Sequence, residues 1–584
     1  MFVGILRTCI GLRFGHLIVI LYGLASTLLA AFNFTVRNEL LEMRQSQSET
    51  LVVVGKSLAS QPQMDNVTKA AVGAADSSGH LDAHPLGGLD CTDHGGPSSR
   101  AAVEDMIYWS DIPADSTYRS PFSRQRTPDD ESSRTNPRKQ YLTFEQDEAG
   151  FNNVRMSMEV IVVLAHSTGR TLVLPPKQKL NMLGGKNGGE EGWTFNDFFH
   201  LDLLAKEHEG IDIISTEEYL REMTSSAVDG NNLPPPPQGR INWDGASREE
   251  LKLLSAYLRD HSVIPQGWDP TECVLGMPST RGQHKLEELL DVMETVAKMA
   301  PADHEVPWDP PPTTPSVEYR LREILGGRKK LCLYTEKLQE AQVLHIPRDH
   351  TDKNYFRLLT HWYAFIFFQD HKTDLYYKRF VRDHIRLRDE LQCSAARIVA
   401  EIRQTARKMG DKDGRFHAMH IRRGDFMEYF PVTGLSAGEL YETSRAELET
   451  LPGVRVLYIA TDEQDKAFFD PFRKNYSVFF LNDFEEIANL PDNDNGFGGM
   501  VDQLVAAKGV TFGGTFWSTF SGYINRLRGY HATKAELSGA ERGELNSFYF
   551  APEQKKYQMR KYMPVKLPLY MREFPTAWIN LGKA

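Results

Sequence analysis

Cysteine is scarce in this sequence: five cysteines in 584 residues exclude a small, disulfide-dense scaffold. An excess of positive charge is missing as well, because 67 Lys and Arg stand against 78 Asp and Glu and the formal net charge is −11. Phosphate backbones select basic surfaces, so nucleic acid is not expected as a partner. Internal repeats, heptads and the G-x-S-x-G motif of serine nucleophiles are also absent. What is present is a chain long enough for two or more domains, with 41% hydrophobic residues to build their cores.

An uncharged apolar run, LIVILYGLASTLLAAF, occupies residues 17–32. It falls slightly short of the roughly 20 residues that a bilayer core needs, but thin early-secretory membranes accept short spans. Positive charge precedes the run at Arg7 and Arg13. The positive-inside rule therefore predicts a cytoplasmic tail over 1–16, a transmembrane signal anchor over 17–34 and a lumenal body. The alternative is a cleaved signal peptide, because small alanines end the run. We expect a single-pass type II protein of the endoplasmic reticulum or Golgi membrane.

Four cysteines follow the apolar run, and their even number is compatible with an oxidising compartment. They allow one or two disulfides, in any of three full pairings, and four buried free thiols are the alternative. The four are Cys91, Cys273, Cys332 and Cys393. Two Asn-x-Ser/Thr tripeptides are candidate glycosylation sites on a lumenal chain, at Asn66 and Asn475.

Composition changes along the first half of the chain. Residues 35–136 have few aromatic clusters and many Ser, Gly, Asp and Arg, which predicts a flexible stem. Residues 139–176 are typical of a strand, then a helix with Val154 and Met158 at helical spacing, then a second strand. The region 180–350 contains Pro/Gly-rich loops and is expected to hold insertions.

Short apolar strands alternate with helices in the second half. Residues 354–370 are mostly apolar and are predicted to form a helix, and beyond them strands are expected at FHAMHI, VRVLYIATDE, SVFFLND and VTFGGT. This alternation is typical of a parallel sheet covered on both faces. We therefore expect an α/β protein with two Rossmann-like domains facing a cleft, over 137–370 and 371–560, and a C-terminal extension over 561–584.

The segment HIRRGDF concentrates charge at a strand end, where doubly wound sheets bind ligands. His417 and His420 are three residues apart on the strand and face opposite sides, which counts against a two-histidine metal site. Arg422 follows as the strand ends, Gly424 permits a tight turn, and Asp425 can hold an arginine fork in place. Arginine forks match phosphate oxygens, so an anion site is predicted. The alternative is a surface ion pair beside a core histidine.

Two further turns carry groups that can bind an anion. GGTFWSTFSGYI places Ser518 and Thr519 at a helix N-terminus, where amides and hydroxyls can hold a phosphate or simply cap the helix. EAGFNN puts Gly150 and Asn152 at the start of the first helix. Together with HIRRGDF, these turns predict anion-binding groups at strand-to-helix connections in both halves of the chain.

These motifs resemble, in their order, those of the GDP-fucose O-fucosyltransferase family: EAGFNN followed by GRTLVLPP, then HIRRGDF, ATDE and GGTFWSTFSGY. The resemblance covers about residues 138–560 and is weak over 180–350. It implies a GT-B fold, in which the first Rossmann-like domain lies on the acceptor side and the second binds the GDP-sugar. It also implies inverting, metal-independent transfer of L-fucose from GDP-β-L-fucose to an acceptor hydroxyl.

The resemblance further implies roles for single residues. His420 and Arg422 fall on the family's histidine–x–arginine motif, whose arginine contacts the donor diphosphate. The other donor-binding positions that it implies are Gly150, Asn152, Asp425, Asp462, Ser518, Thr519 and Phe520. A fixed arginine opposite the β-phosphate would stabilise the charge that develops on departing GDP, as a divalent cation does in other glycosyltransferases.

The general base is where the sequence departs from the family. Some members have a glutamate directly before Gly-Phe-Asn, whereas here Ala149 stands in that place and Glu148 comes one residue earlier. Glu148 is the candidate base, with Asp147 as its nearest competitor. The acidic tripeptides at 411–413 and 492–494 are interpreted as solvated turns, so neither a metal site nor a cofactor is expected.

The function expected from these observations is GDP-fucose-dependent fucosyl transfer by a membrane-anchored lumenal enzyme. Its acceptor would be a hydroxyl of a glycoprotein or a glycan. The alternative is a catalytically silent carbohydrate-binding or scaffolding protein that kept the fold, and the intact Arg422 and Asp425 weigh against it.

Overall fold

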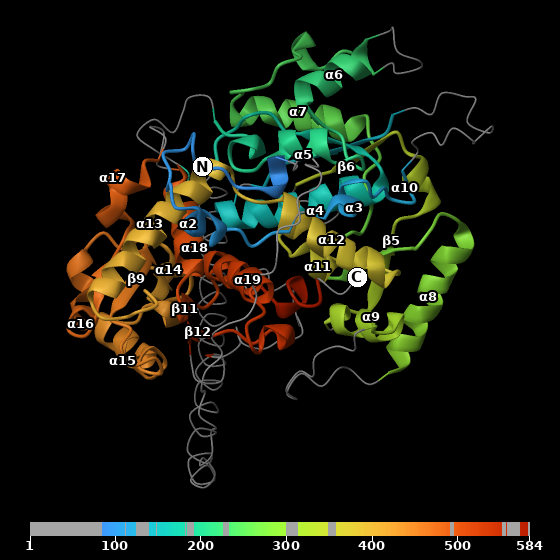
Figure 1. The fold of residues 1–584 in the computed structure, drawn as a ribbon. Helices are drawn as coiled ribbons and strands as arrows, with labels where there is room; N and C mark the ends of the chain where they lie inside the picture. The colour runs from blue at the N-terminus through green and yellow to red at the C-terminus, as the bar shows by residue number, and fades with distance from the viewer. Residues whose placement is uncertain are drawn as a thin grey trace, which may run out of the picture. The chain divides into compact units, whose positions relative to one another are not determined.

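The computed structural model (Figure 1) describes residues 85–123, 139–180, 192–225, 233–299, 314–348, 358–490, 496–551 and 573–581, together with 183 and 556 but without 111, 148 and 327. The described residues all belong to one unit, His80–Ala584. Among them, no helix has the length and apolar character needed to cross a membrane. The expected anchor at 17–34 and the glycosylation candidate Asn66 lie outside the described residues.

The N-terminal half contains a four-stranded parallel sheet in the order β3-β2-β1-β6. Its strands are β1 (Tyr141–Phe144), β2 (Thr171–Leu174), β3 (Ile213–Ser215) and β6 (Val343–Ile346). Helix α4 (Phe151–Thr168) connects β1 to β2, which confirms the predicted strand–helix–strand unit. The sheet is covered on both faces, because alternate residues such as Leu172 and Val173 belong to different core clusters.

The region between 180 and 350 is more regular than its Pro/Gly content predicted. Besides β3 and β6 it contains α5 (Leu201–Glu207), α6 (Thr216–Thr224), α7 (Arg248–Asp260), β4 (Cys273–Met277), α8 (Gln283–Lys298), α9 (Val317–Leu325), β5 (Lys330–Leu333) and α10 (Glu336–Glu340). Strands β4 and β5 join β7 (Ile366–Phe368) in a second parallel sheet, ordered β5-β4-β7. The described residues of the N-terminal half therefore form two sheets, where one was expected.

The prediction of one helix over 354–370 is wrong. Of the described residues 358–370, only α11 (Trp362–Phe365) is helical, and the apolar residues that follow it form β7, which pairs with β4. A short, wholly buried apolar run has the same appearance in sequence whether it is a helix or a strand, because both faces are apolar. The partner strand, over 80 residues earlier in the chain, decides between them.

The C-terminal half is built on a five-stranded parallel sheet in the order β10-β9-β8-β11-β12. Its strands are β8 (His417–Ile421), β9 (Val456–Thr461), β10 (Ser477–Phe479), β11 (Phe512–Thr515) and β12 (Ser547–Phe550). Its helices include α13 (Asp389–Lys408), α14 (Phe426–Tyr429), α15 (Ala437–Leu448), α16 (Asp470–Arg473), α17 (Glu485–Ala488), α18 (Gly498–Ala507) and α19 (Thr519–Lys534). Alternate strand residues again enter separate core clusters, as for Ala418 and Met419, so the predicted doubly covered parallel sheet is present.

The boundary between the halves lies beyond the expected residue 370. Helix α12 (His371–His384) packs on α4 and β7 of the first half, whereas α13 packs on α18 of the second. The expected stem also ends earlier than residue 136. Trp109 is fully buried, its indole N–H donates to the carbonyl of Gly87 at 3.2 Å, and the Arg386 guanidinium lies over its ring. Low aromatic density therefore misled the prediction, since a few aromatic residues anchor 85–123 to the core.

Two disulfides resolve the cysteine pairing that the sequence left open. Cys91 pairs with Cys393 and so joins the N-terminal described segment to α13, and Cys273 pairs with Cys332 across β4 and β5. The four cysteines are therefore not free thiols.

The C-terminal extension also packs into the core over its described residues 573–581. Trp578 is completely buried against Gly529 of α19, where a Cβ would lie 2.3 Å from the indole ring. Glu573, from the same segment, is buried beside the side chain of Arg155 on α4, at 3.1 Å. This segment therefore contacts both halves of the molecule.

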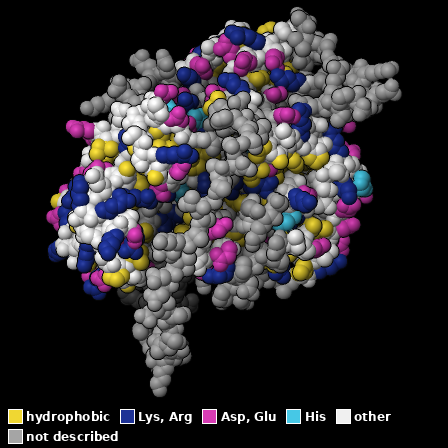
Figure 2. Space-filling model, viewed as in Figure 1, with side chains coloured by type: hydrophobic (Ala, Val, Ile, Leu, Met, Phe, Trp, Pro, Cys, Tyr) yellow, Lys and Arg dark blue, Asp and Glu magenta, His cyan; other side chains and the backbone are white. Residues whose placement is uncertain are grey.

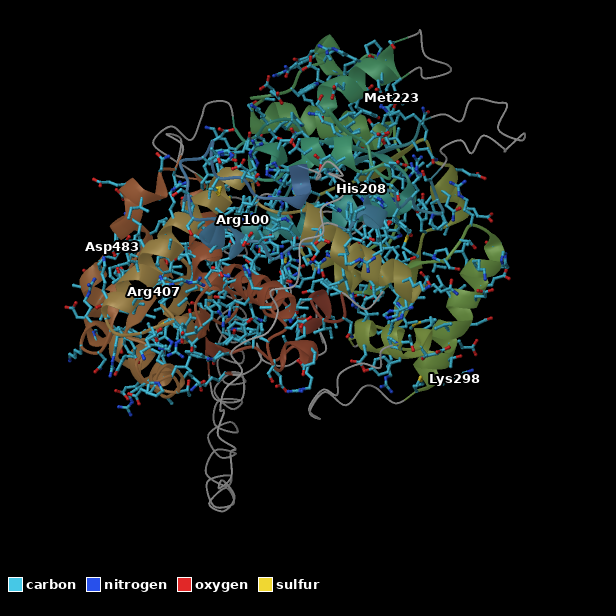
Figure 3. The ribbon with its side chains drawn as sticks, viewed as in Figure 1. Arg100, His208, Met223, Lys298, Arg407 and Asp483 are labelled. Atoms are coloured by element: carbon cyan, nitrogen blue, oxygen red, sulfur yellow. A yellow bond between two sulfur atoms is a disulfide. The ribbon has the colours of Figure 1, made fainter. Side chains whose placement is uncertain are left out.

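Surface charge is mixed on the face that Figure 2 shows, where Lys and Arg side chains are interspersed with Asp and Glu. Cations lie in the last turns of long helices, as for Arg407 and Lys408 on α13 and Lys298 on α8; Figure 3 labels Arg407 and Lys298. Such placements complement the negative ends of the helix dipoles.

Candidate functional site

The loop after β8 holds the arginine that the sequence singled out. The guanidinium of Arg422 donates from Nη2 to Asp425 Oδ1 at 2.5 Å, and from Nη1 to Oδ2 of Asp462. Asp462 directly follows β9, the neighbouring strand. The backbone N–H of Arg422 donates to Oγ1 of Thr515, the last residue of β11, at 2.9 Å. Three adjacent strand ends therefore fix one guanidinium at the carboxyl edge of the sheet.

Gly424 is required for this arrangement. Its φ is +42°, in the left-handed region, and a Cβ there would lie 2.7 Å from Oδ2 of Asp462. A side chain at this position would push away the carboxylate that binds Arg422, so the predicted tight turn has a second, steric reason.

The neighbouring arginine, Arg423, also donates its backbone N–H to Asp462, at 2.7 Å, but its side chain has different partners. Arg423 donates from Nε to Glu463 at 2.8 Å and from Nη1 to the carbonyl of Leu435 at 3.0 Å, and its guanidinium lies 3.9 Å from the ring centroid of Phe468. The Arg423 side chain therefore connects the loop after β9 with the segment that precedes α15. Adjacent residues at a strand end face different sides, which accounts for the contrast between the two arginines.

His420 lies under Arg422 in the core. Its Nδ1 is 2.7 Å from Oγ of Ser521, and its ring stacks on Phe520 with centroids 4.3 Å apart. Burial, with a smaller contribution from the Arg422 charge, lowers the pKa of His420 to about 3. The imidazole is therefore neutral near pH 7. His417 contacts Tyr476 on the other face of the sheet, as the spacing predicted.

The third motif lies beside the arginine loop, because β11 pairs with β8. Helix α19 begins at Thr519, with Ser518 as its N-cap residue, but the Ser518 side chain makes no capping hydrogen bond. The Ser518 hydroxyl therefore does not provide the helix cap that was considered as an alternative from the sequence. Ser518 is buried and Trp517 before it has a φ of +70°, an uncommon conformation for a bulky residue.

Asn152, from the other half of the molecule, joins this group through one glutamine. Asn152 lies in the first turn of α4, after the N-cap residue Gly150, and is nearly buried. Nε2 of Gln503 donates to Oδ1 of Asn152 at 3.1 Å and to the carbonyl of Phe520 at 3.3 Å. The structure therefore brings together the first-helix motif and the Ser518–Phe520 motif, which are over 360 residues apart in sequence.

Sequence reasoning missed Gln503, Ser521 and Thr515. The signal for the first was an Asp-Gln pair in a helix whose other residues are Gly, Ala, Val, Leu and Met. Its neighbour Asp502 accepts from the hydroxyl of Tyr458 at 2.6 Å, and burial raises the pKa of Asp502 to about 7. Polar side chains inside an apolar helix need partners, and that need points to a site.

Of the two candidate bases, only Asp147 belongs to the described residues. Glu148 lies outside the described residues, whereas Asp147 is described and buried.

Among the described residues, no group of three or more His, Cys, Asp or Glu is placed to hold a metal ion. Asp411, expected in a solvated turn, is instead buried and binds Arg415 Nε at 3.0 Å, and residues 492–494 lie outside the described part.

Comparison with known proteins gives the class to which this site belongs. The family model described as GDP-fucose protein O-fucosyltransferase matches residues 141–531, which include every motif residue described above. That span is well over half of the chain, and the chain therefore belongs to the GDP-fucose protein O-fucosyltransferase family.

Solved structures of fucosyltransferases are also similar, at low identity. The chain is 14% identical to fucosyltransferase NodZ from Bradyrhizobium, with a TM-score of 0.29 over 67% of this chain and 93% of that chain. It is 13% identical to POFUT1 in complex with GDP, with a TM-score of 0.31 over 71% and 99% of the two chains. For a mutant of Arabidopsis thaliana FUT1 in complex with GDP the identity is 8% and the TM-score 0.27, over 80% and 77%. No curated protein matches the chain.

Proposed function

We propose that this protein transfers L-fucose from GDP-fucose to a hydroxyl of a protein or glycan acceptor, with inversion and without a metal ion. The observation that carries the proposal is the Arg422 guanidinium, held between Asp425 and Asp462 at the carboxyl edge of the second sheet. A family match over 141–531 supports the donor class.

The chemistry follows from charge. When the bond between the fucose anomeric carbon and the β-phosphate oxygen breaks, its electron pair leaves with GDP. An arginine already fixed by two carboxylates can meet this charge without reorganising, which favours the transition state. We assign donor binding to His420, Asn152, Gly150, Asp425, Asp462, Ser518, Thr519 and Phe520, as the family resemblance implies.

The acceptor hydroxyl must lose its proton as its oxygen attacks the opposite face of the anomeric carbon. Glu148 is proposed as the base, with Asp147 as its competitor, because both lie in the β1–α4 loop that leads to Asn152. Neutral His420, besides the donor contact assigned above, holds the end of β8 against the first turn of α19 through Ser521 and Phe520.

A donor assay separates this proposal from a catalytically silent sugar-binding protein. The purified protein is incubated with labelled GDP-fucose and, in parallel, with other GDP- and UDP-sugars, and both donor hydrolysis and binding are measured. An enzyme releases fucose from GDP-fucose in preference to the other donors. Binding of a sugar without any turnover, in the presence of a broad acceptor panel, would favour the silent protein.

Activity is expected to survive EDTA. Arg422 provides the positive charge that a bound cation provides elsewhere, so chelation should change the initial rate by less than about twofold. The rate with EDTA, and after adding back Mn²⁺ or Mg²⁺, is the measurement. Complete loss on chelation, restored by either metal, would remove metal independence from the proposal.

We also propose that the protein is a type II membrane protein of the endoplasmic reticulum or Golgi with its catalytic body in the lumen. Asn475 is exposed, and its side-chain amide donates to the Tyr441 hydroxyl at 2.7 Å. Resistance to alkaline carbonate extraction and an endoglycosidase-sensitive glycan that is lost in Asn66→Gln are expected. An unglycosylated cytosolic product would overturn the topology, and a soluble product that starts after Ala31 would favour a cleaved signal peptide.

A further inference from the structure

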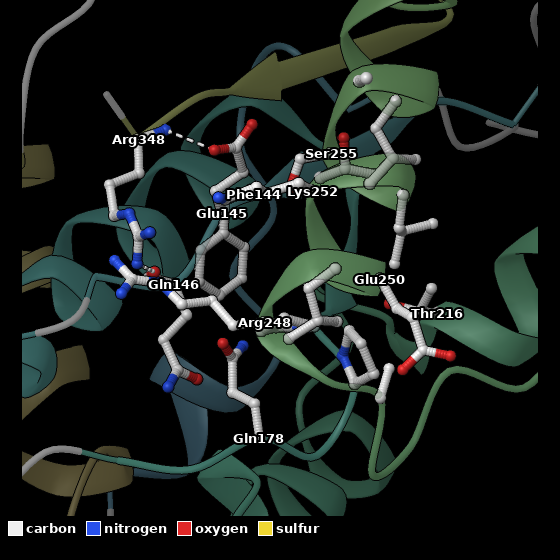
Figure 4. Close-up of a pocket in the computed structure, with 18 of the residues that line it drawn as sticks. Phe144, Glu145, Gln146, Gln178, Thr216, Arg248, Glu250, Lys252, Ser255 and Arg348 are labelled. Atoms are coloured by element: carbon white, nitrogen blue, oxygen red, sulfur yellow. Dashed lines mark hydrogen bonds between the residues drawn. The ribbon is translucent and has the colours of Figure 1, made fainter. Parts of the chain in front are cut away.

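A large pocket opens in the N-terminal half, and Arg422 is not among the residues that line it. Its volume is about 1150 Å³, and it lies between α7 and the carboxyl ends of β1, β2 and β6 (Figure 4). In the sheet order β3-β2-β1-β6, the chain runs outward from β1 on one side and returns to β6 on the other. The pocket therefore occupies the topological switch point, where open α/β sheets bind ligands.

The described residues that line this pocket are biased toward positive charge. Five are basic and two are acidic, although the chain as a whole carries a net charge of −11. The basic residues are Lys179, Arg248, Lys252, Arg259 and Arg348. In Figure 4, Arg248 from α7 and Arg348 from the end of β6 both extend into the space beside Gln146.

Each of the two acidic residues is paired with an arginine, one inside the lining and one outside it. Both oxygens of Glu145 accept from Arg259, each at 2.6 Å, and one also lies 3.0 Å from His345 Nε2. Glu250 caps the start of α7 through Ser247 and pairs with Arg240 at 2.8 Å. Glu145 therefore neutralises Arg259, which is one of the five basic residues, whereas the partner of Glu250 lies outside the lining. After this pairing, four basic residues of the lining stand against Glu250.

The pocket is joined to the donor side by one loop. Arg348 donates from its backbone N–H to Glu145 at 3.1 Å and from Nη1 to the carbonyl of Gln146 at 2.8 Å. These two residues begin the β1–α4 connection, which continues to Gly150 and Asn152. A group bound in the pocket therefore contacts the start of the loop that leads into α4, the helix that carries Asn152.

We infer that this pocket binds an acidic saccharide, whose carboxylate is taken by Arg248 and Arg348, and that this saccharide is the acceptor; the acceptor role rests on the proposed function. Guanidinium groups match carboxylates in a forked geometry. The side-chain amide of Gln178 and the hydroxyl of Ser255 in the lining suit sugar hydroxyls. The volume exceeds what one sugar ring needs and fits a short oligosaccharide.

The test measures binding by calorimetry with the full-length protein. The probes are a hexamer of galacturonic acid, the corresponding neutral hexamer of galactose, and hexaglutamate as an acidic peptide. The variants are Arg248→Glu and Lys179→Glu, both at exposed positions in the pocket lining, with Lys412→Glu as a control at an exposed turn of the other half. GDP binding is measured on every sample.

The acidic hexamer should bind at least about tenfold more tightly than the neutral one, because one charge-assisted contact is worth at least that factor. Arg248→Glu should weaken it by about tenfold or more, and Lys179→Glu by less, while Lys412→Glu and GDP binding stay unchanged. Equal affinity for the neutral hexamer, no binding of the acidic hexamer, or tighter binding of hexaglutamate would each overturn the inference. If the unmodified protein did not bind GDP, that result would instead count against the proposed function.

Discussion

Arg422→Lys should reduce fucose transfer by about 100-fold or more while leaving the fold intact, because removing one preorganised donor to a developing anion has effects of this size. Lysine keeps the charge but replaces a planar fork with a single ammonium group. It cannot contact Asp425 and Asp462 from two separate nitrogens, as the guanidinium does. Initial rates with saturating GDP-fucose measure the effect, and thermal unfolding checks the fold.

Arg423→Lys is the matched control for that experiment. Its side chain contacts Glu463, Leu435 and Phe468, so the change should lower stability slightly and leave the rate within about threefold. If Arg422→Lys turned over at a near-normal rate, Arg422 would have no place in the mechanism. If both variants lost activity equally, the loop as a whole, and not one guanidinium, would be responsible.

Glu159→Gln should destabilise the protein by about 3–5 kcal/mol, the usual cost of removing one partner from a buried ion pair. Glu159 on α4 accepts from Arg155 of the same helix at 2.5 Å and from Nη1 of Arg526 on α19 at 2.9 Å. Arg155 and Arg526 also contact the carboxylate of Glu573, at 3.1 Å and 3.7 Å. The amide would leave two buried guanidinium groups with a single carboxylate.

The control for this prediction is another arginine–glutamate pair at the same helical spacing. Arg100 and Glu104 are 2.6 Å apart, but their side chains are 90% and 56% exposed, so Glu104→Gln should change the free energy of unfolding by less than about 0.5 kcal/mol. Denaturant unfolding of both variants measures the difference. Equal small effects would show that the buried cluster contributes no more than a surface pair.

The pH dependence of stability follows from the same cluster. Burial alone would raise the pKa of Glu573, but Arg526, His361 and Arg155 outweigh it and lower that pKa to about 2. A depressed carboxyl pKa contributes stability that is fully present above the ordinary value of 4.5 and is lost as pH falls toward 2. Glu573→Gln should therefore be less stable at pH 7 and should lose less stability between pH 4.5 and 2 than the unmodified protein.

Local features of the site could be read from the sequence because they depend on neighbours in the chain. The strand that contains His420 is followed in the sequence by an arginine, a glycine and an aspartate. This order determines that a guanidinium, a left-handed turn and a carboxylate come after a buried strand. Spacing along the strand also separated His417 from His420. The partners Asp462, Thr515 and Gln503 could not be assigned in this way, because each comes from a different strand end or helix and meets the motif only through sheet order.

The sequence alone determined the class of this protein: alternating strands and helices require a parallel α/β fold, and the ordered motifs indicate the O-fucosyltransferase family. Only the tertiary structure decided that residues 85–123 pack against the body, that 366–368 is a strand, and which cysteines pair. It also decided that Glu159, Arg526 and Glu573 form one buried cluster, and that the basic side chains beside β1 and β6 line one pocket. The physical reason is that burial and charge pairing depend on contacts between residues hundreds of positions apart, which local periodicity does not encode.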